Sequence, residues 1–288
     1  MSEILQVIMQ LSLLVFVITS MLAMGLNLTL KQIAAPLRNA RLVILALVAN
    51  FILVPILAYV IVLVVPLEQG LATGLILMAT AAGAPFLPKL AQAAKGNVAL
   101  SVGLMVLLMV VTIIYMPIVL PFLLSGVEVN PWEIARSLII LMLIPLGIGI
   151  FVKARYQSTA ESLQPHMAQT STVALVLLMV SALVLNFEVI VGVIGTGAII
   201  AILIFLLVAL VLGYFLGGKD ASTRSVLGLG TAQRNLSAAL VVAGQNFAAY
   251  PSVLSMILVA ALIGLALLMV IGGELGRRSA KPQTESSS

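Results

Sequence analysis

The chain has 288 residues, of which 62% are hydrophobic and 8% are charged, and its net charge is +5. That charged fraction is about a third of the fraction found in soluble domains, so a soluble fold is excluded. A lipid-exposed backbone must satisfy its own hydrogen bonds, which leaves helices or a closed barrel. Apolar runs of about 20 residues favour helices, because barrel strands are about 10 residues long. The composition therefore predicts an all-α, polytopic membrane protein.

Several classes of function are excluded by residue content. The sequence contains no cysteine and one histidine, His166, so thiolate chemistry and a histidine-based metal site are not expected. It shows no nucleophile–base pair and no phosphate-binding loop, so we predict neither an enzyme nor a bound cofactor. The basic residues lie between apolar runs instead of clustering on soluble structure, which argues against nucleic-acid binding. The lipid bilayer is the partner that the composition predicts.

The apolar runs, and the polar residues that separate them, predict nine spans. The first run is interpreted as a retained span, because residues 1–6 carry Glu3 and none of the basic residues that a signal peptide requires. Residues 1–276 are predicted to form the transmembrane domain, and residues 277–288 a disordered cytoplasmic tail. The spans are expected near 5–28, 42–65, 70–93, 98–125, 132–152, 167–187, 193–217, 223–245 and 251–273.

The basic residues predict the orientation of these spans. Lys and Arg in short loops stay on the cytoplasmic side of a membrane. Here they occupy every second connection and the tail, which predicts an N-terminus outside, a cytoplasmic C-terminus and a location in the bacterial inner (plasma) membrane. The residues concerned are Lys31, Arg38, Arg41, Lys95, Lys153, Arg155, Lys219, Arg224, Arg277, Arg278 and Lys281.

Lys89 follows a stretch that cannot form a regular helix. Pro85 and Pro88 lie three residues apart in the third span, just after Gly83. Each proline removes an amide donor and clashes with a preceding carbonyl. Irregular backbone at membrane depth is tolerated where it is buried in protein or lines a cavity. Lys89 is therefore a candidate site residue, with the alternative that its side chain snorkels to the cytoplasmic interface.

Arg234 lies in the most polar stretch inside any predicted span, residues 228–237. A charged side chain at the bilayer centre costs on the order of 3 kcal/mol, so such residues usually face a pathway or a partner. No acidic residue in a span interior is available to neutralise it. Arg234 is predicted either to attract an anion or, alternatively, to bind carbonyls that a broken helix leaves free.

The two polar stretches also correspond to each other. A shift of 150 residues sets Gly83 opposite Gln233 and Ala84 opposite Arg234, and pairs the third span with the eighth. Because five spans separate them, the paired segments cross the membrane in opposite directions. This is the inverted-repeat design of many secondary transporters, whose substrates bind where matching helices are interrupted.

The chain resembles the bile acid:sodium symporter family, within the superfamily that also contains arsenite efflux transporters. The resemblance is carried by residues 24–31, residues 95–101 and the triplet Gln233, Arg234 and Asn235. It implies two broken helices that cross, and a mobile core domain (spans within 42–125 and 193–273) beside a panel domain (spans within 5–28 and 132–187). It also implies alternating access, with the nine-span form lacking the first helix of one repeat.

The sequence departs from this family where the symporters bind two sodium ions. The family's Ser-Asn pair is replaced by Leu87 and Pro88, and its Glu-x-x-x-Gln-Asn pattern has Gly230 and Arg234 in place of Glu and Gln. Asn50, Ser101 and Asn235 remain as oxygen donors, too few for two dehydrated ions. Lys89 and Arg234 are accordingly predicted to occupy the sodium-site regions.

The predicted function is secondary transport of a small organic anion. The changed residues of the sodium-site regions would allow this transport to proceed without sodium. The alternatives are a sodium-coupled symporter with a reduced site, a proton-coupled carrier that uses Lys89, a metalloid efflux carrier, and a passive channel or sensor. The sequence leaves the substrate and the oligomeric state undefined. Candidate substrate-binding residues are Asn27, Thr29, Thr80, Lys89, Thr231, Gln233, Arg234, Asn235 and Ser237, and the ion-site region comprises Asn50, Leu87, Pro88, Ser101, Gly230 and Arg234.

Overall fold

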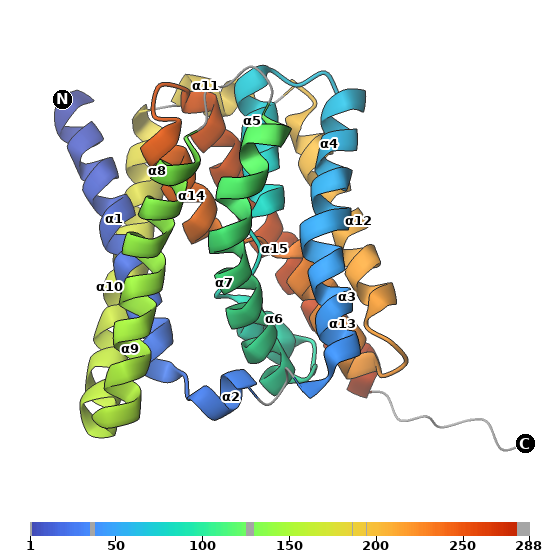
Figure 1. Ribbon diagram of the computed structural model, residues 1–288. Helices are drawn as coiled ribbons and strands as arrows, with labels where there is room; N and C mark the ends of the chain where they lie inside the picture. Colours follow the sequence, from blue (N-terminus) through green and yellow to red (C-terminus); the bar gives the residue numbers. More distant parts are fainter. Residues whose placement is uncertain (1, 35–37, 125–129, 186, 194, 281–288) are drawn as a thin grey trace, which may run out of the picture.

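The computed structural model describes residues 2–34, 38–124, 130–185, 187–193 and 195–280, and these form helices and turns without a strand. Seven helical segments are long and apolar enough to cross a membrane. The prediction of an all-α, polytopic membrane protein is confirmed (Figure 1). The seven segments are α1 (Ser2–Asn27), α3–η2–α4 (Ala40–Val48, Ala49–Leu53, Val54–Val64), α7 (Val98–Leu123), α8–η3–α9 (Pro131–Leu138, Ile139–Leu143, Ile144–Arg155), α10 (Gln157–Leu185), α12 (Ala198–Leu216) and α15 (Pro251–Ala280).

Two further segments are each broken into a pair of short helices. The first pair is α5 (Gln69–Thr80) and α6 (Leu87–Ala93), and the second is α13 (Ala221–Ala232) and α14 (Leu236–Asn246). The pairs run in opposite directions through the bundle, since α5 and α14 lie at its upper end in Figure 1 and α6 and α13 at its lower end. The described residues thus contain seven long segments and two broken pairs, and the prediction that these make nine membrane crossings stays a prediction. The short helices α2 (Leu30–Ala34) and α11 (Phe187–Gly192) connect the others.

Asparagine and aspartate side chains begin many of these helices. Their side-chain oxygens accept a hydrogen bond from a free backbone N–H of the first turn, which stabilises a helix end by about 1 kcal/mol. Asn97 starts α7 in this way, through Leu100 N–H at 3.0 Å. Asp220 starts α13 through Thr223 N–H at 2.8 Å. Hydrogen bonds from the Thr223 and Ser222 hydroxyls and from Thr223 N–H lower the pKa of the Asp220 carboxyl.

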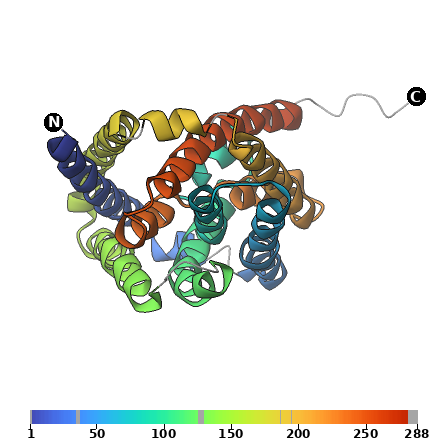
Figure 2. The same cartoon turned by 90° about the horizontal axis from the view of Figure 1, so that it is seen from above.

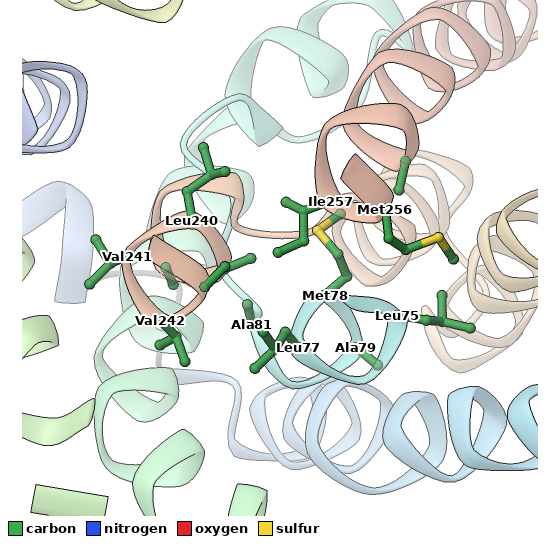
Figure 3. Close-up of a cluster of buried hydrophobic side chains, with 14 of the residues drawn as sticks. Leu75, Leu77, Met78, Ala79, Ala81, Leu240, Val241, Val242, Met256 and Ile257 are labelled. Carbon is green, nitrogen blue, oxygen red and sulfur yellow. The ribbon is translucent and has the colours of Figure 1, made fainter. Parts of the chain in front are cut away.

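Two groups of helices are visible from above (Figure 2). In one group α1 packs along α10 and α9. The α1 and α9 backbones touch at Gly25 and Gly149, where the Cβ of any larger residue at position 25 would lie 2.4 Å from the Leu146 carbonyl oxygen. In the other group α15 crosses the bundle and contacts α5, α6, α13 and α14. Figure 3 shows side chains of α5, α14 and α15, including Leu77 and Ile257, packed beside the first break.

Two predicted boundaries differ from the structure. Helix α10 begins at Gln157, ten residues before the predicted span, because a polar extension precedes the apolar run. Glu161 stabilises this extension by accepting hydrogen bonds from Gln157 (2.9 Å) and Lys153 (3.2 Å). Helix α15 continues to Ala280, so residues 277–280 are helical and do not belong to a disordered tail. Residues 281–288 lie outside the described part of the chain.

Candidate functional site: the crossing of the broken helices

The first broken segment is held open by hydrogen bonds from other helices. Gly83 adopts φ +79°, and its missing side chain admits the α7 backbone, since a Cβ there would lie 2.2 Å from Met109 N. Thr112, in α7, accepts a hydrogen bond from Ala82 N–H (2.9 Å) and donates one to the Ala82 carbonyl (3.1 Å). The irregular backbone is therefore paired, as burial among helices requires.

Arg234 fills the space between the two broken segments. Only 2% of its surface is exposed, and its guanidinium donates four hydrogen bonds. Nε donates to the Met78 carbonyl (3.1 Å) and Nη2 to the Ala79 carbonyl (2.7 Å), at the C-terminal end of α5. Nη1 donates to the Thr231 carbonyl (3.0 Å), at the C-terminal end of α13. A single cation thus compensates the negative ends of two half-helices.

Asn50 completes the shell around the guanidinium. Its side-chain oxygen accepts the second Nη1 hydrogen bond at 2.7 Å, and its amide donates to the Ala46 carbonyl (3.0 Å) and the Thr231 hydroxyl (3.4 Å). Asn50 lies in the π-helical turn η2, just before Pro55. Because Pro55 has no N–H for the Phe51 carbonyl, the Tyr115 hydroxyl donates to that oxygen instead, at 2.6 Å.

Asn235 joins the second break to the first. Its backbone N–H donates to the Ala81 carbonyl (2.8 Å), and its side-chain amide donates to the Gly83 carbonyl (3.1 Å). Its side-chain oxygen accepts from Ala238 N–H (3.1 Å) and so caps α14. Arg234 and Asn235 together satisfy carbonyls of Met78, Ala79, Ala81 and Gly83 along the break.

Leu87 and Gly230, two of the positions where sodium ligands were missing, pack against each other. Leu87 is 1% exposed, and a Cβ added to Gly230 would lie 2.9 Å from its Cδ2 atom. A leucine side chain thus occupies the volume next to position 230. Pro88 is half-buried in the first turn of α6. Ser101 is buried, and its hydroxyl donates to the Val98 carbonyl of its own helix (2.6 Å).

Lys89 does not join this cluster. Its side chain is exposed on α6, and its Nζ atom lies 5.5 Å from the centre of the Phe86 ring. Lys89 and Arg234 were both expected in the ion-site regions. Of the two, only Arg234 lies at the crossing. The physical reason is that α6 restarts at Leu87, which points Leu87 and Leu90 inward and Lys89 outward.

The remaining predicted site residues are divided between buried and exposed positions. Thr80 bonds the Ile76 and Leu77 carbonyls of its own helix, both at 3.0 Å. Ser237 is buried and Gln233 is half-buried, and within the described residues neither side chain makes a hydrogen bond. Asn27 is exposed at the end of α1. Thr29 caps α2, where its hydroxyl and the Gln32 side chain form a reciprocal capping box.

Sequence reasoning missed two residues of α7: Thr112, which bonds the first break, and Tyr115, which bonds the Phe51 carbonyl in η2. Their signal was weak, because single hydroxyls in a span usually bond their own helix. The structure also refines the repeat. Helices α5 and α13 each have 12 residues and end at Thr80 and Ala232, an offset of 152 residues instead of 150.

A membrane protein built from crossed, interrupted helices that run in opposite directions has the architecture of a secondary transporter. The chain belongs to the Sodium Bile acid symporter family, whose sequence profile matches residues 13–193. This match runs from the middle of α1 to α11 and includes the first break, whereas Arg234 lies beyond it. Members of this family are transporters and not enzymes.

Two relatives that match part of the chain are chloroplastic proteins of plants. The chain is 26% identical to "Probable sodium/metabolite cotransporter BASS3, chloroplastic" of Arabidopsis thaliana over 196 residues, which are 68% of this chain and 46% of the relative. It is 33% identical to "Probable sodium/metabolite cotransporter BASS2, chloroplastic" of Oryza sativa subsp. japonica over 143 residues, 49% of this chain and 34% of the relative. The chain therefore spans less than half the length of these relatives.

Proposed function

We propose that the protein is a secondary transporter of a small organic anion that works by alternating access and does not need sodium. The observation that carries this proposal is the position of Arg234. Its guanidinium binds carbonyls of both broken helices, at a crossing where the symporters that the sequence resembles hold sodium. The charge that a sodium ion would bring on each cycle is thus part of the chain.

The geometry at the crossing disfavours sodium binding in two ways. First, the oxygens that face it, from Asn50, Ala79 and Thr231, already accept hydrogen bonds from Arg234. Second, a fixed positive charge about 4 Å away repels a sodium ion by roughly 4 kcal/mol at an effective dielectric of about 20. Leu87 also fills the volume beside Gly230 with a side chain that offers no ligand.

The helix contacts support a division into two moving units. We assign α1, α8–η3–α9 and α10 to a panel domain, and α3 to α7 and α12 to α15 to a core domain. The two units meet mainly through α8, which contacts α7 and α14, and through α1 against α14. The inner half of the fifth span, α9, contacts α1, α10 and η3 instead. Contacts concentrated at one end suit a structure whose other end opens.

Charge favours an anionic substrate. The acidic residues of the described chain, such as Glu68, Glu133 and Asp220, lie at or near helix ends. Lys89 is an exposed cation a few residues after the first break. We assign Lys89 to attraction of the substrate anion, with Gln233 as a neutral hydrogen-bonding group at the second break. Topology follows the basic residues, with the N-terminus outside and the C-terminus inside a bacterial plasma membrane.

The proposal is tested by exchange in proteoliposomes. Purified protein is reconstituted, loaded with an unlabelled organic anion and supplied with trace labelled anion, using mono- and dicarboxylates and a bile acid. Saturable trans-stimulated exchange of one of these anions is expected, together with a raised KM and unchanged thermal stability in Lys89→Gln. Non-saturable flux, or exchange restricted to neutral or cationic solutes, would contradict the proposal.

A further inference from the structure

The guanidinium of Arg224 is held against the last turn of α12, at the lower end of the bundle in Figure 1. Its central carbon lies 4.2 Å from the centre of the Tyr214 ring and 5.9 Å from the centre of the Phe215 ring. Its Nε atom donates to the Tyr214 carbonyl at 3.4 Å. Within the described residues, its two Nη atoms make no hydrogen bond and Arg224 forms no ion pair. The guanidinium is thus fixed by two rings while the donors of its outer nitrogens stay free.

Basic residues from three other places in the chain surround this end. The starts of α3 and α7 and the end of α12 meet here, where Leu42, Val98 and Leu216 pack against one hydrophobic cluster. The same segments carry further cations, and within the described residues none of them forms an ion pair with an acidic side chain. They are Arg38, Arg41, Lys95 and Lys219.

Asp220, the acidic residue nearest to Arg224 in the chain, already has its charge compensated. Its carboxylate accepts hydrogen bonds from Thr223 N–H (2.8 Å), from the Thr223 hydroxyl (2.7 Å) and from the Ser222 hydroxyl (2.7 Å). It also caps the N-terminus of α13, where the helix dipole favours a negative charge. The field around the free donors of Arg224 therefore remains positive.

An apolar ridge on α12 leads from Arg224 towards the other end of the bundle. Helix α12 lies at the edge of the bundle in Figure 1 and in Figure 2, and it packs on α13 and α15 with its other side. The ridge begins at Phe215, one of the two rings beside the guanidinium. It comprises Ile200, Ile204, Val208, Val211 and Phe215, each of them between 37% and 71% exposed.

We propose that Arg224 and Lys219 bind the headgroup of an anionic phospholipid whose acyl chains lie along the α12 ridge. A guanidinium presents its donors as a planar fork that matches two oxygens of one phosphate group. Clusters of basic residues beside a membrane helix attract lipids with a net negative charge. A soluble phosphate compound has the same charge but makes no use of the ridge, so the ligand is a lipid. None of these residues belongs to the crossing of the broken helices, so the site does not depend on the proposed transport function.

Native mass spectrometry of lipid titrations tests the proposal. Purified wild type is titrated with phosphatidylglycerol or with phosphatidylcholine of the same acyl chains. The first phosphatidylglycerol is expected to bind about tenfold more tightly, since two basic side chains attract its charge. Arg224→Gln should weaken its binding about tenfold, the value of one charge-assisted hydrogen bond. Arg136→Gln, which removes an exposed cation from α8 at the opposite end of the bundle, should leave it unchanged.

Further arms separate the site from a general charge effect and from a loss of folding. Arg224→Lys keeps the charge without the fork, so its affinity should lie between those of the wild type and Arg224→Gln. Lys219→Gln changes an exposed side chain, so we expect an unchanged melting temperature and weaker phosphatidylglycerol binding. Excess glycerol phosphate should not displace the lipid.

Three results would overturn the proposal, whatever the transport assays show. The first is equal affinity of the wild type for the two lipids. The second is unchanged phosphatidylglycerol affinity in both Arg224→Gln and Lys219→Gln. The third is displacement of the lipid by glycerol phosphate, which would show a site for soluble phosphate compounds instead.

Discussion

The Nη2 atom of Arg234 lies 2.7 Å from the carbonyl oxygen of Ala79, across the crossing of two interrupted helices. The two residues are 155 positions apart in the chain and belong to opposite halves of the repeat. The hydrogen bond is short because the donor is charged and the acceptor ends a helix. It ties the two halves together at the point where a transporter of this design places its ions.

Replacement of Arg234 by Met should destabilise the protein. It leaves the Ala79 carbonyl and the Asn50 side-chain oxygen buried without their donor, at about 1–3 kcal/mol for each group. Removal of the buried charge recovers part of this, so we expect a net loss of about 3 kcal/mol. Equilibrium unfolding in mixed micelles measures it.

Lys89→Met is the matched control for Arg234→Met. It removes a cation of the same charge from an exposed position six residues after Gly83, and we expect a change within about 0.5 kcal/mol. Equal destabilisation by the two substitutions would show that Arg234 is not the structural cation of the crossing.

Substitutions at Asn235 separate its two roles. Asn235→Ser retains a cap for α14 but is too short to reach the Gly83 carbonyl, whereas Asn235→Ala loses both functions. We expect Ala to cost about 1 kcal/mol more than Ser, the typical value of an N-cap. The midpoints of thermal unfolding of the two variants provide the comparison, and identical midpoints would remove the capping role.

Leu87 and Gly230 should behave as a coupled pair. Gly230→Ala places a methyl group 2.9 Å from the Leu87 side chain, an overpacking expected to cost about 1–3 kcal/mol. In the Leu87→Ser background the same change should cost less, because the facing side chain is smaller. A double-mutant cycle on unfolding free energies measures the coupling. Additive effects would place the two residues out of contact.

The contact between α1 and α9 can be tested with two neighbouring glycines. A Cβ at position 149 would lie 2.7 Å from the Leu22 carbonyl oxygen, whereas at Gly147 nothing lies within 4 Å. We expect Gly149→Ala to destabilise by about 2 kcal/mol, through overpacking. Gly147→Ala should be neutral or stabilise by up to about 1 kcal/mol, since Ala favours helix. The reverse order of melting temperatures would contradict the described packing.

Most of the fold can be predicted from the sequence because a lipid environment permits few arrangements of the backbone. Apolar runs and the alternation of basic loops give the spans to within a few residues, and the prolines near Lys89 give the first break. Solvent-exposed helix is outside the reach of a hydropathy argument. The start of α10 at Gln157 was missed for this reason, because polar side chains form hydrogen bonds in the turns that precede the apolar run.

The site was predicted in part. Arg234 stood out because a charge inside a span needs partners, and the alternative reading, that it binds carbonyls freed by a broken helix, matches its contacts. The direction in which Lys89 points depends on where α6 restarts, and a sequence does not fix the phase of a seven-residue helix after a break. Thr112 bonds the backbone of Ala82, thirty residues earlier in the chain, a contact that only tertiary packing reveals.

Uptake in sodium-free medium measures whether Arg234 takes the place of sodium. Proteoliposomes of the wild type are assayed with a transported anion while sodium is replaced by choline on both sides. Arg234→Gln combined with Gly230→Glu, Leu87→Ser and Pro88→Asn serves as the comparison, since it restores the ligand pattern. We predict equal initial rates for the wild type in sodium and in choline, and sodium-stimulated uptake for the restored variant. Loss of wild-type uptake in choline would contradict it.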